Sequence, residues 1–162
     1  MFQRIMKSAI VAGIAALALA GCSGSVGFGD ETIRSFDIHY TVERDGAVHV
    51  VETIDYDFAG ADDRHGIDRY LASRFFTDTA GQDRVYRYSN IEVSSPTGAS
   101  ALFSTSLDNA LQIRVGNKNA HVRGAQTYVI SYDIAGALNR AQQPDGSYLD
   151  EFYWNATGSY WD

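Results

Sequence analysis

Cysteine and proline are almost absent from this sequence of 162 residues, which has one cysteine, Cys22, and two prolines. A single cysteine excludes both a disulfide framework and a metal site built from several cysteines. Long hydrophobic runs are missing as well, because the apolar run at residues 9–20 has about 12 residues and a membrane-spanning helix needs roughly 20. Basic residues are few, 13 against 20 acidic ones, and the net charge of −7 does not fit a nucleic-acid-binding surface.

The motifs of common hydrolytic and phosphoryl-transfer sites are also absent. The sequence contains no Gly-x-Ser-x-Gly, no His-Glu-x-x-His and no Gly-Lys-Ser/Thr. Enzymatic activity of these classes therefore has no positive support, and no catalytic residue is predicted.

What the sequence does have begins with an export signal. A short basic segment with Arg4 and Lys7 precedes the apolar run, which is the layout of a secretory signal peptide. The run closes on Leu19-Ala20-Gly21-Cys22, which resembles the bacterial lipobox. That resemblance implies that residues 1–21 are a lipoprotein signal peptide and that Cys22 becomes a lipidated N-terminus, held stably because two or more acyl chains are attached to it. The alternative is an ordinary signal peptide with an incidental cysteine.

The part of the chain after the signal peptide has the size of one domain. Residues 22–32 are rich in Gly and Ser and are predicted to be a flexible tether, and residues 33–162 are predicted to be the folded domain. Since Arg4 and Lys7 are lost with the signal, the exported part holds 20 acidic and 11 basic residues. An acidic balance of this kind favours solubility near an anionic surface.

A β-hairpin is predicted over residues 36–58, where two alternating runs flank Asp45-Gly46. A two-residue loop would set the apolar face of the first run against the polar face of the second. A three-residue loop, Arg44 to Gly46 with Gly46 left-handed in a bulge, instead pairs Val42 with Val48 and places like faces together, so we predict this register.

Further strands are predicted at residues 85–94, 101–107, 111–115 and 127–134, and another begins near Phe152. A long loop is expected at about 59–84, with residues 66–71 as its ordered centre, and one helical turn is expected at most within residues 135–143. Turns are predicted at residues 116–119 and 144–146. Many short strands without helical periodicity predict an all-β fold, an antiparallel β-sandwich of Ig-like or jelly-roll-like form. The sequence stops at Asp162 soon after the last strand begins, so we expect that strand to be cut off.

The predicted hairpin register places Glu52 on the apolar face, opposite Ile38. A buried carboxylate needs a partner, and a guanidinium can provide two hydrogen bonds at once. Arg69 is the candidate, which makes Glu52 and Arg69 a predicted structural ion pair rather than a catalytic acid and its neighbour.

Three other groups of residues are candidates for ligand binding. Carboxylates clustered after the hairpin could supply oxygens to a calcium ion: Asp55, Asp57, Asp62, Asp63 and Asp68. His39 and His49 lie diagonally on the outer hairpin face, without an evident third metal ligand. Aromatic residues near the end of the sequence form either core or a sugar- or partner-binding platform: Tyr148, Phe152, Tyr153, Trp154, Tyr160 and Trp161. The solvated acidic face and the core are the simpler interpretations of the first and last groups.

Several segments, in this order, resemble a known family: residues 48–58, Gly66-Ile-Asp-Arg69, residues 124–134, and residues 153–158 with Trp161. Together they are similar to the extracytoplasmic domain of the bacterial predicted membrane proteins called domain-of-unknown-function family 2207, over about residues 33–162. The resemblance implies an exported β-sandwich that in longer relatives precedes transmembrane helices, and it implies no established activity. Glu52 and Arg69 lie at matching positions.

The function we expect is that of a lipid-anchored, extracytoplasmic interaction or sensing module of the bacterial cell envelope. The membrane is its partner through Cys22, and an envelope protein or glycan is the further partner expected. One alternative is an envelope hydrolase that acts on glycan or peptide through carboxylates at residues 55–68 in an acidic cleft. Another is a purely structural ectodomain fragment of a larger polytopic membrane protein.

Overall fold

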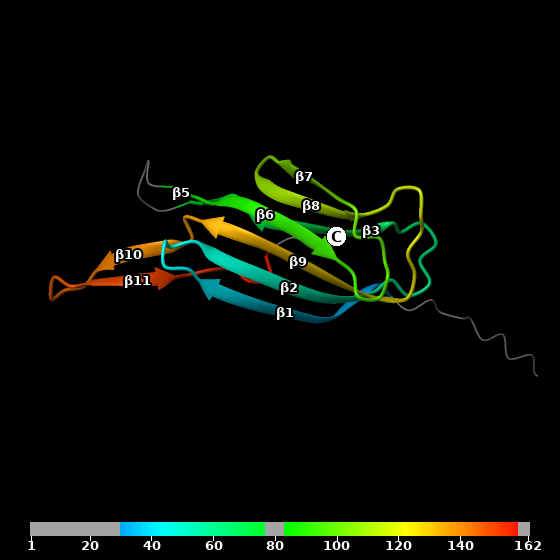
Figure 1. Cartoon of the computed structure of the whole chain (residues 1–162), viewed down its shortest axis with the longest axis horizontal. Coiled ribbons are helices and arrows are strands. Elements are labelled where there is room, and N and C mark those ends of the chain that lie inside the picture. The colour runs from blue at the N-terminus through cyan, green and yellow to red at the C-terminus, as the bar shows by residue number, and fades with distance from the viewer. Residues whose placement is uncertain (1–29, 77–82, 159–162) are drawn as a thin grey trace, which may run out of the picture.

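The computed structural model describes residues 30–76 and 83–158 (Figure 1). The signal peptide, Cys22, Tyr160, Trp161 and most of the predicted tether lie outside the described residues. A four-stranded antiparallel sheet, sheet A, has the order β1-β2-β9-β6 and consists of β1 (Thr32–Val42), β2 (Val48–Asp57), β9 (Ala125–Ala135) and β6 (Arg87–Ser94). A three-stranded antiparallel sheet, sheet B, has the order β3-β8-β7 and consists of β3 (Gly66–Ala72), β8 (Ala110–Gly116) and β7 (Phe103–Leu107).

Two short ribbons extend from these sheets. β4 (Arg74–Phe75) pairs with β5 (Arg84–Val85), and β10 (Leu138–Gln142) pairs with β11 (Tyr148–Phe152). The described residues contain strands and no helix. The predicted all-β antiparallel sandwich is confirmed.

The core lies between the inner faces of the two sheets. Alternate residues of β2 and β9 are buried on the side of sheet A, among them Val50, Ile54 and Ile130, and they form one cluster with Ile113 and other residues of sheet B. Burial of each such side chain contributes about 1.5–3 kcal/mol. The alternation of buried and exposed residues in the strands of both sheets therefore determines which faces of the sheets form the core.

The predicted hairpin register is confirmed. Val42 pairs with Val48, Phe36 with Ile54, and Ile38 with Glu52. Gly46 has a φ of 87° and its N–H donates to the carbonyl of Glu43, so the three-residue loop and its left-handed glycine are as expected.

Three expectations need correction. The segment 59–84 is not one long loop, because residues 66–72 form β3. The strand was not recognised because Arg69 occupies the buried position between Ile67 and Leu71, where an alternating strand usually has an apolar residue. The segment 135–143 holds β10 instead of a helical turn, because the turn at Pro144-Asp-Gly146 folds the chain back on it. For the same reason the strand expected to begin near Phe152 is β11, which ends there.

Candidate functional site

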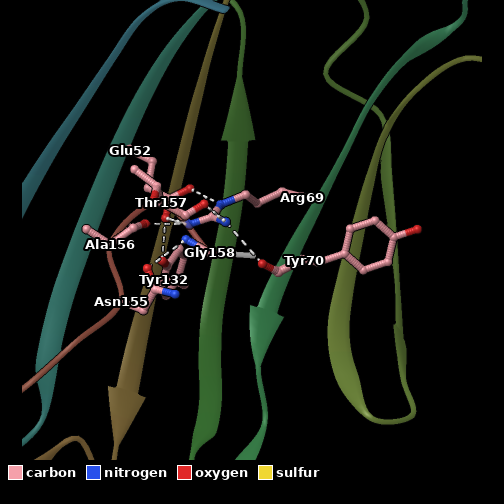
Figure 2. Close-up of polar contacts among 8 residues, drawn as sticks. All are labelled: Glu52, Arg69, Tyr70, Tyr132, Asn155, Ala156, Thr157 and Gly158. Carbon is pink, nitrogen blue, oxygen red and sulfur yellow. Dashed lines mark hydrogen bonds and ion pairs between the residues drawn. The ribbon is translucent and has the colours of Figure 1, made fainter. Parts of the chain in front are cut away.

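A buried polar cluster crosses the centre of the sandwich. Arg69 projects from β3 of sheet B toward Glu52 on β2 of sheet A, and the two side chains are 1% and 0% exposed (Figure 2). Arg69 Nε donates to Glu52 Oε2 and Nη2 donates to Oε1, both at 2.7 Å, which is the bidentate geometry of an arginine–carboxylate pair. The structure therefore brings together the two residues that the sequence singled out.

The remaining donors of Arg69 reach main-chain carbonyls. Nη1 donates to the carbonyls of Tyr70 at 3.0 Å and Thr157 at 3.2 Å, and Nη2 donates to the carbonyl of Ala156 at 3.0 Å. A guanidinium has five N–H groups, and all of them are used within the protein. The arginine consequently connects sheet B, sheet A and the C-terminal segment, which we define as residues 153–158.

Tyr132 completes the cluster by donating its hydroxyl to Glu52 Oε1 at 2.6 Å. Burial, followed by the charge and hydrogen bond of Glu52, raises the pKa of Tyr132 far above its ordinary value. Burial alone would lower the pKa of Arg69, but its hydrogen bonds and charge interaction with Glu52 outweigh burial and raise that pKa. The hydroxyl of Tyr132 thus stays a donor and the guanidinium stays charged.

The sequence analysis missed Tyr132 and the carbonyls of Ala156 and Thr157. Tyr132 carried a signal, because alternation placed it on the inner face of its strand, and it lies two residues from Ile130, which pairs with Glu52. No sequence signal pointed to the carbonyls of Ala156 and Thr157, because every residue type has a main-chain oxygen.

Four of the five aspartates proposed for calcium are distributed over separate interactions, and the fifth, Asp63, lines a surface pocket beside Arg64. Asp55 accepts hydrogen bonds from Thr127 and Ser35, which lower its pKa. Other carboxylates pair with arginines: Asp57 with Arg34, Asp62 with Arg123, and Asp68 with Arg114. Asp68 belongs to sheet B and Asp55 and Asp57 to sheet A. Within the described ranges, no group of three or more His, Cys, Asp or Glu residues is placed to hold a metal ion.

The two histidines lie as predicted on neighbouring strands, since Thr41 pairs with His49 and His39 pairs with Val51. His49 Nδ1 is 2.7 Å from Asp133 Oδ1, and the other oxygen of Asp133 accepts a hydrogen bond from Asn90. The hydrogen bonds of Asn90 and His49 lower the pKa of Asp133. His49 therefore has a carboxylate partner on β9, which the hairpin alone did not reveal.

The aromatic residues near the end of the sequence divide between core and surface. Phe152 and Trp154 pack against the core and stack on each other, with ring centroids 6.4 Å apart. Tyr148 and Tyr153 are exposed. Tyr153 lies beside Phe75 at the rim of a pocket of about 470 Å³, which Tyr86 and Trp154 also line.

Comparison with known proteins places the chain in a family. No curated protein and no solved structure matched it. In the portion of the chain that the structure describes, no helix is long and apolar enough to cross a membrane. The family described as "Predicted membrane protein (DUF2207) N-terminal domain" matches residues 32–162, which confirms the resemblance seen in the sequence. The chain therefore belongs to the DUF2207 family of predicted membrane proteins and corresponds to its N-terminal domain.

Proposed function

We propose that this domain is a non-enzymatic interaction module of the bacterial cell envelope, displayed on the extracytoplasmic side and held at the membrane by a lipid on Cys22. The signal peptide layout and the Leu-Ala-Gly-Cys sequence support export and lipidation. The membership of a family of predicted membrane proteins supports a place at the membrane.

The observation that carries the proposal is an apolar surface at the β4–β5 end of the sandwich. We call it the end patch and define it by Phe75 and Tyr153, whose ring centroids are 6.4 Å apart, and by the exposed Phe76 that follows Phe75. Phe76 is 75% exposed and Tyr153 is 63% exposed. Large apolar side chains that gather on a surface mark interaction sites more often than scattered ones do.

The chemistry around the end patch fits a protein partner. Arg84 lies over the ring of Phe75, with 5.8 Å between its Cζ and the ring centroid, and Arg74 precedes Phe75 in the chain. Aromatic and arginine side chains are the types enriched at protein interfaces. Arg74 pairs with Asp83 at 3.3 Å, so the cation that the end patch presents to a partner is Arg84, and an acidic group of the partner is favoured opposite it.

The hydrolase alternative is less well supported. It requires an acidic cleft, and the pocket that holds Asp63 and Asp68 has a volume of about 340 Å³ but is also lined by Arg64, Arg114 and Lys118. Asp68 is bound there by Arg114 through two carboxylate oxygens. Three cations against two carboxylates do not make the pocket acidic.

Site-specific photocrosslinking in the native host tests the end patch. The full chain carries benzoylphenylalanine at position 76, and a matched variant carries it at position 148, an exposed aromatic position on the β10–β11 ribbon. We expect a discrete protein adduct from position 76 that is absent from position 148. The double variant Phe75→Ser/Tyr153→Ser should remove this adduct without lowering the midpoint of thermal unfolding.

The results that would contradict the proposal are equally specific. Equal adducts from positions 76 and 148 would mean that the end patch is not selective. Adducts to glycan alone would identify a saccharide platform, and no adduct at either position would favour a purely structural ectodomain.

The lipid anchor is tested separately by Cys22→Ser. We expect an unprocessed precursor or release of the domain from the membrane, because the thioether cannot form on serine. Unchanged processing and unchanged membrane retention would show that Cys22 is not the anchor.

A further inference from the structure

The strand β7 differs from the other edges of the two sheets. It forms one edge of sheet B, pairs with β8 on one side, and is exposed along its whole length. The chain from Ser94 to Leu107 contains no charged residue. Edge strands of soluble proteins usually carry charges, prolines or bulges that prevent pairing with another chain, and β7 has none of these.

The other edges of the two sheets in the described part of the chain are protected. β3, at the opposite edge of sheet B, carries Asp68 and the inward-pointing Arg69. β6 is interrupted by an irregularity between Ser89 and Glu92, with Asn90 at a φ of 52°. β1 carries Arg34 and Asp37 and also contains a bulge between Ile33 and Ser35, and its inward residue Tyr40 is packed by Phe152.

The inward face of β7 carries Phe103, Thr105 and Leu107 but is not covered by sheet A. Phe103 and Leu107 pair with Val115 and Leu111, which are buried in the core, so their side chains point to the core side of sheet B. Phe103 is nevertheless 43% exposed and Leu107 is 69% exposed. Figure 1 shows β7 at the margin of the molecule, on the side of β8 away from β3.

The free hydrogen-bonding groups of β7 can be identified from its pairing with β8. The N–H of Gly116 donates to the carbonyl of Leu102 at 2.8 Å. Hydrogen-bonded pairs alternate with non-bonded pairs in an antiparallel ladder, so Ser104 and Ser106 bond to β8. The N–H and C=O groups of Phe103, Thr105 and Leu107 therefore face the open edge.

We propose that β7 is a dimerisation edge at which a second copy of this chain pairs antiparallel, with Thr105 on the two-fold axis. In a two-fold interface residue i meets the partner's residue j and residue j meets the partner's residue i, and with Thr105 on the axis the sequence Phe-Ser-Thr-Ser-Leu sets apolar against apolar and hydroxyl against hydroxyl residues. Phe103 then lies opposite the partner's Leu107, and Thr105 lies opposite the partner's Thr105. Every open-edge N–H and C=O of the three residues gains a partner, and two three-stranded sheets become one continuous sheet.

Charge opposes a second copy least at this place. Two copies, each with 20 acidic and 11 basic residues in its exported part, repel each other over most of their surfaces. The uncharged segment from Ser94 to Leu107 is where that repulsion is smallest and where apolar side chains meet apolar side chains.

Cysteine crosslinking of the full chain in its native membrane tests the proposed axis. Residues directly opposite each other in a hydrogen-bonded pair have Cα atoms about 5.5 Å apart, within the range that a disulfide spans. We expect Thr105→Cys to give a disulfide-linked dimer under mild oxidation. The matched variant Thr41→Cys, at an exposed threonine on the edge strand β1, should give at least tenfold less, and wild type reports any contribution of Cys22.

A charge-repulsion pair gives an independent measurement. In detergent, the wild-type protein and the control variant Thr41→Lys should sediment as dimers. The variant Thr105→Lys should sediment as a monomer, because two ammonium groups would meet on the two-fold axis. The midpoint of thermal unfolding of Thr105→Lys, measured at low protein concentration, verifies that it folds. Monomeric wild type at high concentration, or equal crosslinking at positions 105 and 41, would overturn the proposal.

Discussion

Arg69 has five N–H groups, and the protein supplies an acceptor for each of them: two carboxylate oxygens of Glu52 and three main-chain carbonyls. A buried ion pair is not in itself evidence of stability, because desolvation of two charges offsets their attraction. Removal of only one partner of the pair, however, is strongly destabilising. A lone carboxylate left at position 52 would be both buried and charged.

The first prediction concerns this asymmetry. Arg69→Met should lower the free energy of unfolding by about 3–5 kcal/mol, because Glu52 is left without its counter-ion. The matched control is Arg114→Met, which removes the exposed pair with Asp68 and should cost less than about 1 kcal/mol. Urea unfolding followed by tryptophan fluorescence measures both. Equal losses in the two variants would contradict a structural role for the buried pair.

The second prediction compares two buried tyrosines of β9 by the same chemical change. Tyr132 donates to Glu52, whereas the hydroxyl of Tyr128 is buried without a hydrogen-bond partner in the described part of the chain. Tyr132→Phe should cost about 1.5–3 kcal/mol, because a hydrogen bond to a charged group is lost. Tyr128→Phe should be neutral or stabilising. The reverse order in urea unfolding would show that Tyr132 is not part of the cluster.

At this scale the sequence predicts the pair but not its surroundings. Parity of the hairpin placed Glu52 on the inner face, and the cost of burying a carboxylate demanded a cation. The contacts to Ala156 and Thr157 could not be predicted, because carbonyl acceptors have no residue signature and the position of the C-terminal segment depends on the whole fold.

The C-terminal segment is the element that the cluster holds most directly. It has no strand pairing of its own after β11 ends at Phe152, and two of its carbonyls bond to Arg69. Gly158 lies against the same guanidinium: its φ is 75°, and an added Cβ would be 2.9 Å from Arg69 Nη1. A side chain at position 158 therefore competes with the carbonyls for the arginine.

The third prediction follows from this contact. Gly158→Ala and Gly98→Ala both place alanine at a positive φ, which costs about 1–2 kcal/mol, but an added Cβ at Gly98 has no atom within 4 Å. Gly158→Ala should therefore lower the free energy of unfolding by more than Gly98→Ala does. The difference should be roughly 1 kcal/mol for each carbonyl hydrogen bond to Arg69 that is lost. It should also speed hydrogen exchange in residues 153–158. If the two variants lose equal stability, the segment does not depend on its contact with Arg69.

Elements were predictable where apolar alternation was complete. The β1–β2 hairpin alternates except at Glu52, and its register followed from the sequence. The strand β9 also alternates and was predicted, but its pairing with β2 was not. β3 was hidden by its one buried arginine. β10 was missed because Leu138-Asn-Arg-Ala-Gln142 forms a ribbon beside the core, where no face is fully buried and no alternation is required.

The fourth prediction belongs to the whole molecule, because four tyrosines on the strands β1, β6 and β9 have pKa values shifted in the same direction. Burial is the largest cause that raises the pKa of Tyr40 and of Tyr128 from 10 to about 12, and it raises those of Tyr88 and Tyr132 further. Above pH 10 the unfolded chain loses these protons while the folded chain keeps them. The contribution of these tyrosines to the free energy of unfolding should therefore be constant below pH 10 and should fall as the pH rises from 10 to about 12.

Urea unfolding across this pH range, with the ultraviolet absorbance of tyrosinate as a second signal, measures the effect. Tyr128→Phe is the control, since removing one of these hydroxyls should make the decline shallower. The prediction would be contradicted if all tyrosines of the folded protein ionised at the same pH as the tyrosines of the urea-unfolded chain.

The five hydrogen bonds of Arg69 also have a mechanical consequence. A force that pulls on residues 153–158 acts first on the two carbonyls bound to Arg69. From there the load passes through the guanidinium to Glu52 on β2, which is hydrogen-bonded to a strand on each side. Tension at this end of the chain is therefore borne by the middle of sheet A rather than by the β10–β11 ribbon at its margin, and the strands of that sheet share the load before any of them is peeled away.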